Sequence, residues 1–319
     1  MAAPAHIPFQ NYCKELLAVF KKAKTNSDPA LFLYKNKART ALFMAESILR
    51  VSNKLFEDKE IGEWRTTIKK LEDHLGEMDL YIVLLADYSK LKTVKVQQLE
   101  YISKKLDKAI DKFNKKLLKH DFYLEDLKKM SAGFKINFND KNMVLQLHEE
   151  IRSELKESCD FFNQFPKGFT HMEDQVHELR RKIRWISIYA ASFQGLIALN
   201  EPKENYKWEK EFITKEEAKN PFNKLPIKKN LNQYILFNKK AFYAMSFVIG
   251  NLGEIKDNCI RLQYLEKASK KTTIEKGTDH ALLAQKQLNV KYSHDALLKE
   301  AHILLKLYFN KYKIHEILT

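Results

Sequence analysis

The distribution of proline limits this chain more than any other feature of its sequence. All seven prolines lie outside two long tracts, residues 30–165 and 227–319. Proline breaks the interior of a helix, and both tracts are rich in lysine, leucine, glutamate and alanine, which suit helices. With 45% hydrophobic residues in 319, the chain can also bury one large core or two modest ones. These features predict an all-α protein.

Apolar residues recur at helical spacing along most of the chain, and capping residues indicate where several helices begin. Asp28 followed by Pro29, and later Asp279 and Ser293, are typical of N-caps. Residues 131–142 break the pattern and are expected to form a loop. The expected helices are 9–24, 29–49, 60–85, 94–130, 143–163, 176–197, 232–267, 279–287 and 294–317.

The predicted helix 176–197 has an apolar face and, opposite it, a cationic face. At about 100° per residue, its apolar side chains gather on one side. The other side carries His177, Arg180, Arg181 and Arg184. No residue of this stripe neutralises the others, so we expect an anion between them. A solvated basic face on a surface helix would show the same pattern.

A short motif occurs twice in the chain. Leu75-Gly76-Glu77 has a counterpart in Leu252-Gly253-Glu254, and each copy follows an amphipathic helix with a basic start. Arg39 in the first of these helices can be matched with Arg180 in the second. The separation between arginine and motif is longer in the second copy, and the excess is close to the length of a proline-rich segment, 201–230. The sequence therefore predicts a duplicated helical unit with an insertion in its second copy.

These repeated residues resemble the CHAD domain, the conserved histidine α-helical domain. The hallmark of that family is a helix with His, then Leu-Arg and further basic residues, followed by a helix with Leu-Gly and a nearby Asp, all present twice. The resemblance covers residues 9–319 and is most specific at 176–197 and 245–262. The matching residues are His177, Leu179, Arg180, Arg184, Leu252, Gly253 and Asp257.

The resemblance implies two pseudo-symmetric antiparallel helical bundles, each a four-helix unit, around a basic groove that binds inorganic polyphosphate. Residues 1–319 would form one CHAD-like domain, with a first repeat at 9–130 and a second at 142–319 that contains the insertion 201–230. The family is a binding or targeting module, often at polyphosphate granules, and not an enzyme. We therefore expect neither a cofactor nor a bound metal.

The first copy departs from the family pattern. Asn36 stands at the histidine position, Phe43 and Met44 stand at later basic positions, and Asp79 falls one residue early. We therefore expect a lopsided groove, whose better-preserved wall is helix 176–197.

Binding of polyphosphate favours a row of Arg and Lys on rigid helices, because each phosphate carries about one negative charge. Arginine suits this role because its guanidinium can hold two phosphate oxygens. A histidine beside arginines gains its charge when phosphate binds; a hydrogen bond to Glu173 or Asp174 is the alternative role of His177. The expected polyphosphate contacts are His177, Arg180, Arg181, Arg184, Arg39, Lys35, Lys69, Lys239 and Lys240.

The net charge of +15 favours polyanions in general, so a basic helical nucleic-acid-binding protein is the alternative function. Trp64, Trp185 and Trp208 could stack on bases, although packing is the usual role of such residues. A phosphatase or kinase acting on phosphate chains is a third possibility, and the missing set of metal-binding carboxylates argues against it. The cluster around His171 and His177 is a poor metal site, because arginines flank it.

The three cysteines, Cys13, Cys159 and Cys259, are widely spaced and predict reduced thiols rather than disulfides or a zinc site. No apolar run reaches about 18 residues, and the first residues lack the pattern of a signal peptide. The sequence predicts a soluble, cytoplasmic protein without a membrane span.

Overall fold

The computed structural model describes residues 5–227, 231, 234–272 and 277–319, and it confirms the prediction of an all-α protein. A turn at Asp121–Tyr123 joins the last two helices of the first part of the chain. The helices of this part are α1 (Pro8–Lys24), α2 (Pro29–Lys35), α3 (Ala38–Phe56), α4 (Lys59–Tyr88), α5 (Val96–Lys119) and α6 (Leu124–Gly133).

The second part adds seven helices and two short strands within the described residues. The strands β1 (Ile197–Asn200) and β2 (Ile235–Asn238) pair in parallel, with Ile197 opposite Ile235. The helices are α7 (Lys141–Asn163), α8 (Glu178–Ser192), α9 (Glu209–Phe212), α10 (Lys215–Lys219), α11 (Lys239–Thr272), α12 (His280–Leu288) and α13 (His294–Lys306). Shorter turns lie at Met172–His177, Pro221–Asn223, Leu307–Lys311 and Ile314–Ile317.

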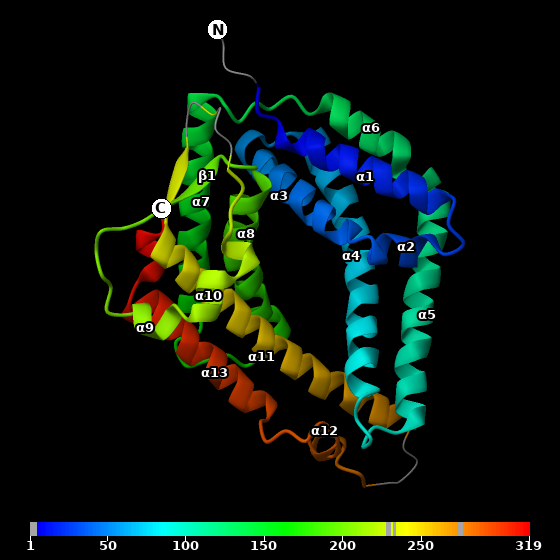
Figure 1. Ribbon diagram of the computed structural model, residues 1–319. Helices are drawn as coiled ribbons and strands as arrows, with labels where there is room; N and C mark the ends of the chain where they lie inside the picture. Colours follow the sequence, from blue (N-terminus) through cyan, green and yellow to red (C-terminus); the bar gives the residue numbers. More distant parts are fainter. Residues whose placement is uncertain (1–4, 228–230, 232–233, 273–276) are drawn as a thin grey trace.

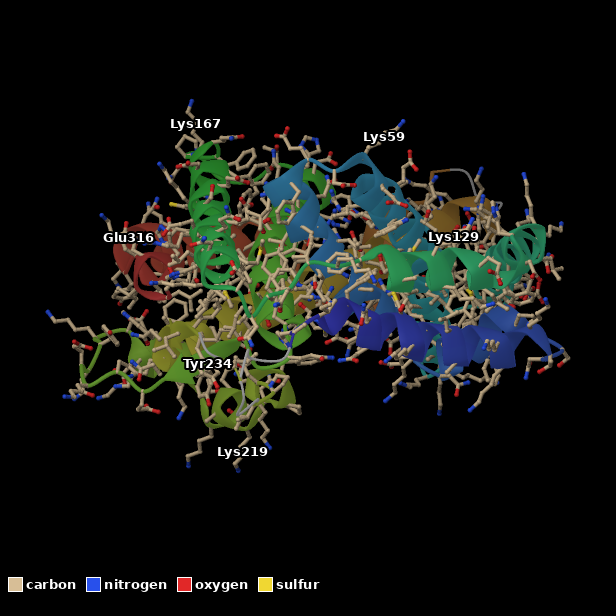
Figure 2. All side chains as sticks on the ribbon, turned by 90° about the horizontal axis from the view of Figure 1, so that it is seen from above. Lys59, Lys129, Lys167, Lys219, Tyr234 and Glu316 are labelled. Carbon is tan, nitrogen blue, oxygen red and sulfur yellow. The ribbon has the colours of Figure 1, made fainter. Side chains whose placement is uncertain are left out.

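Helix α3 lies at the centre of the packing. It contacts α1 and α4 in the first part and α7 and α8 in the second, and apolar side chains of both parts form one core. Figure 1 shows α4 and α5 side by side, with the long helix α11 running toward their ends. In Figure 2, seen from above, α6 with Lys129 lies alongside α1.

A buried polar network fixes α3 against the second part. The guanidinium of Arg50 lies 3.3 Å from Oε1 of Glu154 on α7. The hydroxyl of Tyr189 on α8 donates to the same carboxylate at 3.0 Å. Lys54 adds a further ion pair to Glu154 at 2.9 Å. Buried charges need such partners, so this network couples three helices that are far apart in the sequence.

Three expected helix starts are confirmed by their caps. Asp28 accepts a hydrogen bond from the backbone of Leu31, with Pro29 in the first turn. Asp279 and Ser293 cap α12 and α13 in the same way. Each side chain satisfies a backbone N–H that the first helical turn leaves without a partner.

Two expected helices of the first part are each divided in two. The helix expected at 29–49 breaks because Lys37 adopts a left-handed conformation (φ 55°) between α2 and α3. The helix expected at 94–130 breaks at the left-handed turn Asp121–Tyr123. Its second half, α6, continues to Gly133 and so takes up the start of the loop expected at 131–142.

For three expected helices of the second part, the predicted position of one end was wrong. The helix expected at 176–197 ends at Ser192, and Ile197 begins β1. The segment expected to be helical from 232 forms β2 before α11 begins at Lys239, and residues 232–233 lie outside the described residues. The final helix continues from α13 as a π-helix to Lys311 and ends there, and a separate 3₁₀ turn spans Ile314–Ile317.

The proline-rich segment 201–230 contains short elements in its described part. Its helices α9 and α10 pack against α11, and Phe212 of α9 is buried. Lys219 at the end of α10 lies at the periphery of the molecule in Figure 2. Among the described residues, none of the helices combines the length and apolar character that crossing a membrane requires.

Candidate polyanion-binding groove

A groove of about 700 Å³ lies between the two parts of the chain. Helices α3 and α4 form one wall; α8, the turn before it and α11 form the other. The charged residues on the first wall are Arg39, Glu46, Lys69, Glu72, Asp73 and Glu77. Those on the second wall are Glu173, His177, Arg181, Arg184, Lys256 and Lys267.

On the first wall, Arg39 is held by two carboxylates of α4. Its Nε donates to Oε1 of Glu72 at 2.8 Å, and its Nη1 donates to Oδ2 of Asp79 at 2.7 Å. The guanidinium lies directly on Gly76, where an added Cβ atom would come within 2.8 Å of Nη2. The glycine in the first copy of the repeated motif therefore makes room for an arginine.

Arg180 of α8, which is one of the expected contacts but does not line the groove, makes the equivalent contact. A Cβ atom added to Gly253 would lie 2.9 Å from its Nη2. Its Nε donates to the backbone oxygen of Ile249 at 3.0 Å. Ile249 is the counterpart of Glu72 when the two Leu-Gly-Glu motifs are aligned. The two arginines thus use the same atoms toward corresponding positions of α4 and α11.

The two arginines differ in how their charge is balanced. In the same alignment of the two motifs, the counterpart of Asp79 is Lys256. A carboxylate in the first copy is therefore replaced by a cation in the second. Arg180 makes no ion pair with any described residue, and burial lowers its pKa, with Asp257 opposing the change. At this position the first copy places a carboxylate beside its arginine, whereas the second copy adds a further cation to the groove.

Arg184 is the clearest case of a cation without a counterion. Its guanidinium carbon lies 4.7 Å from the centre of the Phe43 ring, and within the described ranges it makes no ion pair. Phe43 is the position of the first copy that corresponds to Arg184 when Arg39 is matched with Arg180. Burial, with the nearby cations Arg180 and Arg39, lowers the pKa of Arg184 to about 10. Arg184 therefore carries its charge in surroundings that disfavour it, because the side chain is partly desolvated and lies near other cations.

His177 faces the same cations. Burial, followed by the charges of Lys256 and Arg180, lowers its pKa to about 4. Its Nδ1 atom is buried without a hydrogen-bond partner, while Nε2 lies 3.8 Å from Oε1 of Glu173. The alternative role of His177, a hydrogen bond to Glu173, is therefore at most a long contact, since 3.8 Å exceeds hydrogen-bonding distance. The imidazole is neutral at pH 7.

The remaining expected contacts are distributed unevenly. Arg181 lines the groove but pairs at 3.3 Å with Glu178, a residue of the same helix outside the cationic stripe, so its charge is partly neutralised. Lys69 also lines the groove and pairs with Glu72 and Asp73.

Three expected lysines do not line the groove. Lys35 lies exposed at the end of α2. Lys239 and Lys240 begin α11, where they pair with Glu201 at 2.5 Å and Glu209 at 3.0 Å. These carboxylates belong to the segment 201–230, so the structure joins the two lysines to the insertion rather than to the groove.

Several groove residues could not be identified from sequence. Lys256 and Lys267 contribute two cations of the second wall, and among the described residues Lys256 pairs only with its exposed neighbour Asp257, at 2.9 Å. Glu46 lies at 1% exposure, and its Oε2 atom has no hydrogen-bond partner. Burial raises the pKa of Glu46 to about 7, with Lys69 opposing and Glu72 reinforcing the change. A sequence signal exists only for Lys256, which follows the second Leu-Gly-Glu motif.

Six Lys and Arg side chains and five carboxylates line the groove, so its total charge is close to neutral. The charges are, however, unevenly distributed between the two walls. The first wall has two cations and four carboxylates, whereas the second has four cations and one carboxylate besides His177. The expected lopsided groove therefore has walls of opposite sign, and an anion is attracted to only one of them.

In the part of the chain that the structure describes, no three His, Cys, Asp or Glu side chains converge as metal ligands would. No family model, no curated protein and no solved structure matches this chain.

Proposed function

We propose that this protein binds inorganic polyphosphate, without catalysis, along the α8–α11 wall of the groove. The observation that carries this proposal is Arg184, a half-buried arginine that lines the groove without an ion pair in the described part of the chain. Desolvating a cation among other cations costs stability unless an anion enters. A phosphate group beside Arg184 would supply that anion.

The residues around Arg184 suit a phosphate chain rather than a single anion. His177 precedes α8, Arg180 lies on its first turn, and Lys256 faces them from α11. Consecutive phosphates of a chain could meet Arg184 and Lys256, with the His177 imidazole as a hydrogen-bonding group and Arg180 adding its charge beside the groove. Both arginines are held by packing, Arg180 on Gly253 and Arg184 on Phe43, so little side-chain entropy is lost on binding.

The opposite wall limits what can bind. Glu72 and Asp73 are engaged with Arg39 and Lys69, so the cations of this wall are already neutralised. A narrow chain lying against α8 can avoid the carboxylates, whereas a duplex carries phosphates on both of its sides. The groove therefore favours a single phosphate chain over double-stranded DNA. We also propose a cytoplasmic location, and, as the resemblance to the CHAD domain implies, association with polyphosphate granules.

A binding titration with two variants tests this function. Long-chain polyphosphate and duplex DNA, matched in total charge, are titrated at about 0.15 M salt, where unspecific attraction is weak. We expect polyphosphate to bind at least tenfold more tightly than the duplex. Arg184→Met should weaken polyphosphate binding at least tenfold. Arg152→Met, which removes an exposed arginine of α7 that pairs with Glu149, is the matched control.

Equal affinity for the duplex would overturn the assignment to polyphosphate. Equal effects of Arg184→Met and Arg152→Met would show that only net charge matters and would remove the groove as the site. Circular dichroism of both variants checks that the helical content is retained.

A further inference from the structure

A second cavity, of about 280 Å³, lies between α4, α5 and α6. It shares no lining residue with the polyanion-binding groove, because it opens on another face of α4. The proposed binding of polyphosphate makes no use of it. Its volume is near the lower end of the range for small-molecule pockets, about 300 Å³, so it suits one compact group.

Three aromatic side chains line part of this otherwise polar cavity. Trp64 of α4 lines it and is only partly buried. His120 and Tyr123 lie on the other side, stacked on each other with ring centres 4.7 Å apart and an interplanar angle of 13°. A tryptophan and a stacked pair of rings that line the same cavity provide flat, apolar surface of the kind on which a nucleobase stacks.

Tyr123 also brings an unused polar group into the cavity. Its side chain is 5% exposed, and its hydroxyl makes no hydrogen bond with any residue in the described ranges. The hydroxyl is not among the buried atoms that lack a partner, so it is accessible and free to hydrogen-bond a ligand in the cavity.

The chain adopts a costly conformation to place Tyr123 there. Asp121, Phe122 and Tyr123 have φ values of 42°, 58° and 55°, so three consecutive residues without glycine are left-handed. Side chains other than glycine disfavour this conformation. Phe122 is buried at 3% exposure, which anchors the turn. Strained backbone of this kind is concentrated at binding sites, and here it sets the aromatic wall.

Lysines border the cavity and continue away from it. Lys70, Lys116 and Lys129 line it, and none of them makes an ion pair within the described part of the chain. Lys116 also belongs to an exposed lysine face of α5. The other lysines of that face are Lys108, Lys112, Lys115 and Lys119. An anionic backbone could therefore run along α5 and reach the cavity at Lys116.

We propose that this cavity binds a nucleotide unit, with the base stacked on Trp64, a base polar group bonded to the Tyr123 hydroxyl, and the phosphate at Lys116. The three carboxylates at the rim, Glu60, Glu63 and Asp126, are free of ion pairs in the described residues and can accept hydrogen bonds from sugar hydroxyls. The unit is supplied either by a single strand lying along the lysine face of α5 or by a free mononucleotide.

Calorimetric titration of the full chain with a single-stranded DNA dodecamer and with a nucleoside monophosphate tests this site. Loss of base stacking costs about 1–3 kcal/mol. Trp64→Leu should therefore weaken binding by about 5- to 150-fold, and Trp64→Phe should restore most of it. Tyr123→Phe, which removes a single oxygen atom and keeps the fold, should weaken binding severalfold.

Lys14→Gln, at an exposed lysine of α1 away from both sites, is the control for charge and should have little effect. Lys115→Gln distinguishes the two sources, since it should weaken binding of the oligonucleotide and leave the monophosphate unaffected. Binding of neither ligand, or unchanged affinity in both Trp64→Leu and Tyr123→Phe, would overturn the site.

Arg184→Met separates this inference from the proposed function. It should weaken polyphosphate and leave the oligonucleotide bound as in the wild type. If Arg184→Met weakened the oligonucleotide while Trp64→Leu did not, nucleic acid would occupy the groove and the second site would fail. If polyphosphate did not bind but the nucleotide ligands did, the proposed function would fail and the second site would be supported.

Discussion

The guanidinium of Arg180 rests on the backbone of Gly253, where an added Cβ atom would lie 2.9 Å from Nη2. Such a distance is too short for a real contact, so a side chain at this position must displace the arginine. The arginine is the end of a flexible chain and can move outward at low cost, but it then leaves the position that it holds beside the groove.

Gly253→Ala should therefore separate stability from binding. Alanine is favoured over glycine in a helix by about 1 kcal/mol, which offsets the displacement of Arg180, so we expect the free energy of unfolding to change little. Polyphosphate affinity should fall at least fivefold. Gly250→Ala, earlier on α11 with no heavy atom within 4 Å of the added Cβ, is the matched control. It should raise stability by about 1 kcal/mol and leave affinity unchanged, as measured by urea unfolding and titration.

The two arginines that line the groove on opposite walls, Arg39 and Arg184, should respond oppositely to replacement by methionine. Arg39→Met leaves Glu72, a carboxylate at 5% side-chain exposure, without its closest partner, and should cost about 1–3 kcal/mol. Arg184→Met removes a desolvated cation and keeps the packing on Phe43, so stability should be unchanged or higher. Chemical denaturation of both variants measures this difference. A loss of stability in Arg184→Met equal to that in Arg39→Met would show that Arg184 has a counterion within the protein.

The titration of His177 predicts how stability depends on acid. Its pKa is lowered to about 4 in the folded protein, below the ordinary value of 6.5, so the unfolded chain binds more protons. Its contribution is present above pH 6.5 and is lost as pH falls through about 4. His177→Gln should therefore be more stable than the wild type at pH 4 by up to about 3 kcal/mol, and similar to it at pH 8. A constant difference between pH 8 and pH 4 would contradict this assignment.

Glu46 has the opposite dependence. Burial raises its pKa from 4.5 to about 7, so the folded protein binds more protons and is destabilised as pH rises from 4.5 through 7. Glu46→Gln should match the wild type near pH 4.5 and exceed it at pH 8, by up to about 3 kcal/mol. Thermal melting at both pH values provides the measurement.

A bound phosphate favours the protonated forms of both Glu46 and His177, so polyphosphate should bind more tightly at pH 6 than at pH 8.

The sequence was sufficient to predict the helical class and three caps, because proline-free tracts and N-cap side chains act locally. It could not predict the break at Lys37, where no glycine or proline marks the left-handed residue. It also could not predict the strands at Ile197 and Ile235, since these short segments are stabilised by pairing with each other across the segment between them.

In the candidate site, too, some features follow from local sequence and others depend on contacts between distant segments. The stripe from His177 to Arg184 follows from helical spacing, and the structure places His177, Arg181 and Arg184 on the groove. Which cations are neutralised depends on partners from other helices. Arg39 and Arg180 are both arginines at matched positions of the repeat, yet one meets two carboxylates and the other a backbone oxygen. Only the fold brings Glu46 into the groove.

The acidic wall gives the last prediction, because it should weaken binding of any polyanion in the groove. Glu77 lines this wall at 37% side-chain exposure and pairs with Lys112 of α5 at 3.0 Å. An exposed pair of this kind contributes at most about 1 kcal/mol, so Glu77→Gln should fold normally. Removing its charge should tighten polyphosphate binding about two- to threefold at low salt, and this gain should disappear at about 0.5 M salt.

Glu125→Gln tests whether position matters or only net charge. Glu125 is likewise exposed and pairs with a lysine, Lys128 at 2.5 Å, but it lies on α6 and not in the groove. Both variants raise the net charge by one. If polyphosphate lies along α8, only Glu77→Gln reduces the electrostatic repulsion of the bound polyphosphate. Glu125→Gln should then leave the affinity nearly unchanged. Equal gains in the two variants would mean that the chain binds outside the groove, on the general positive charge of the surface.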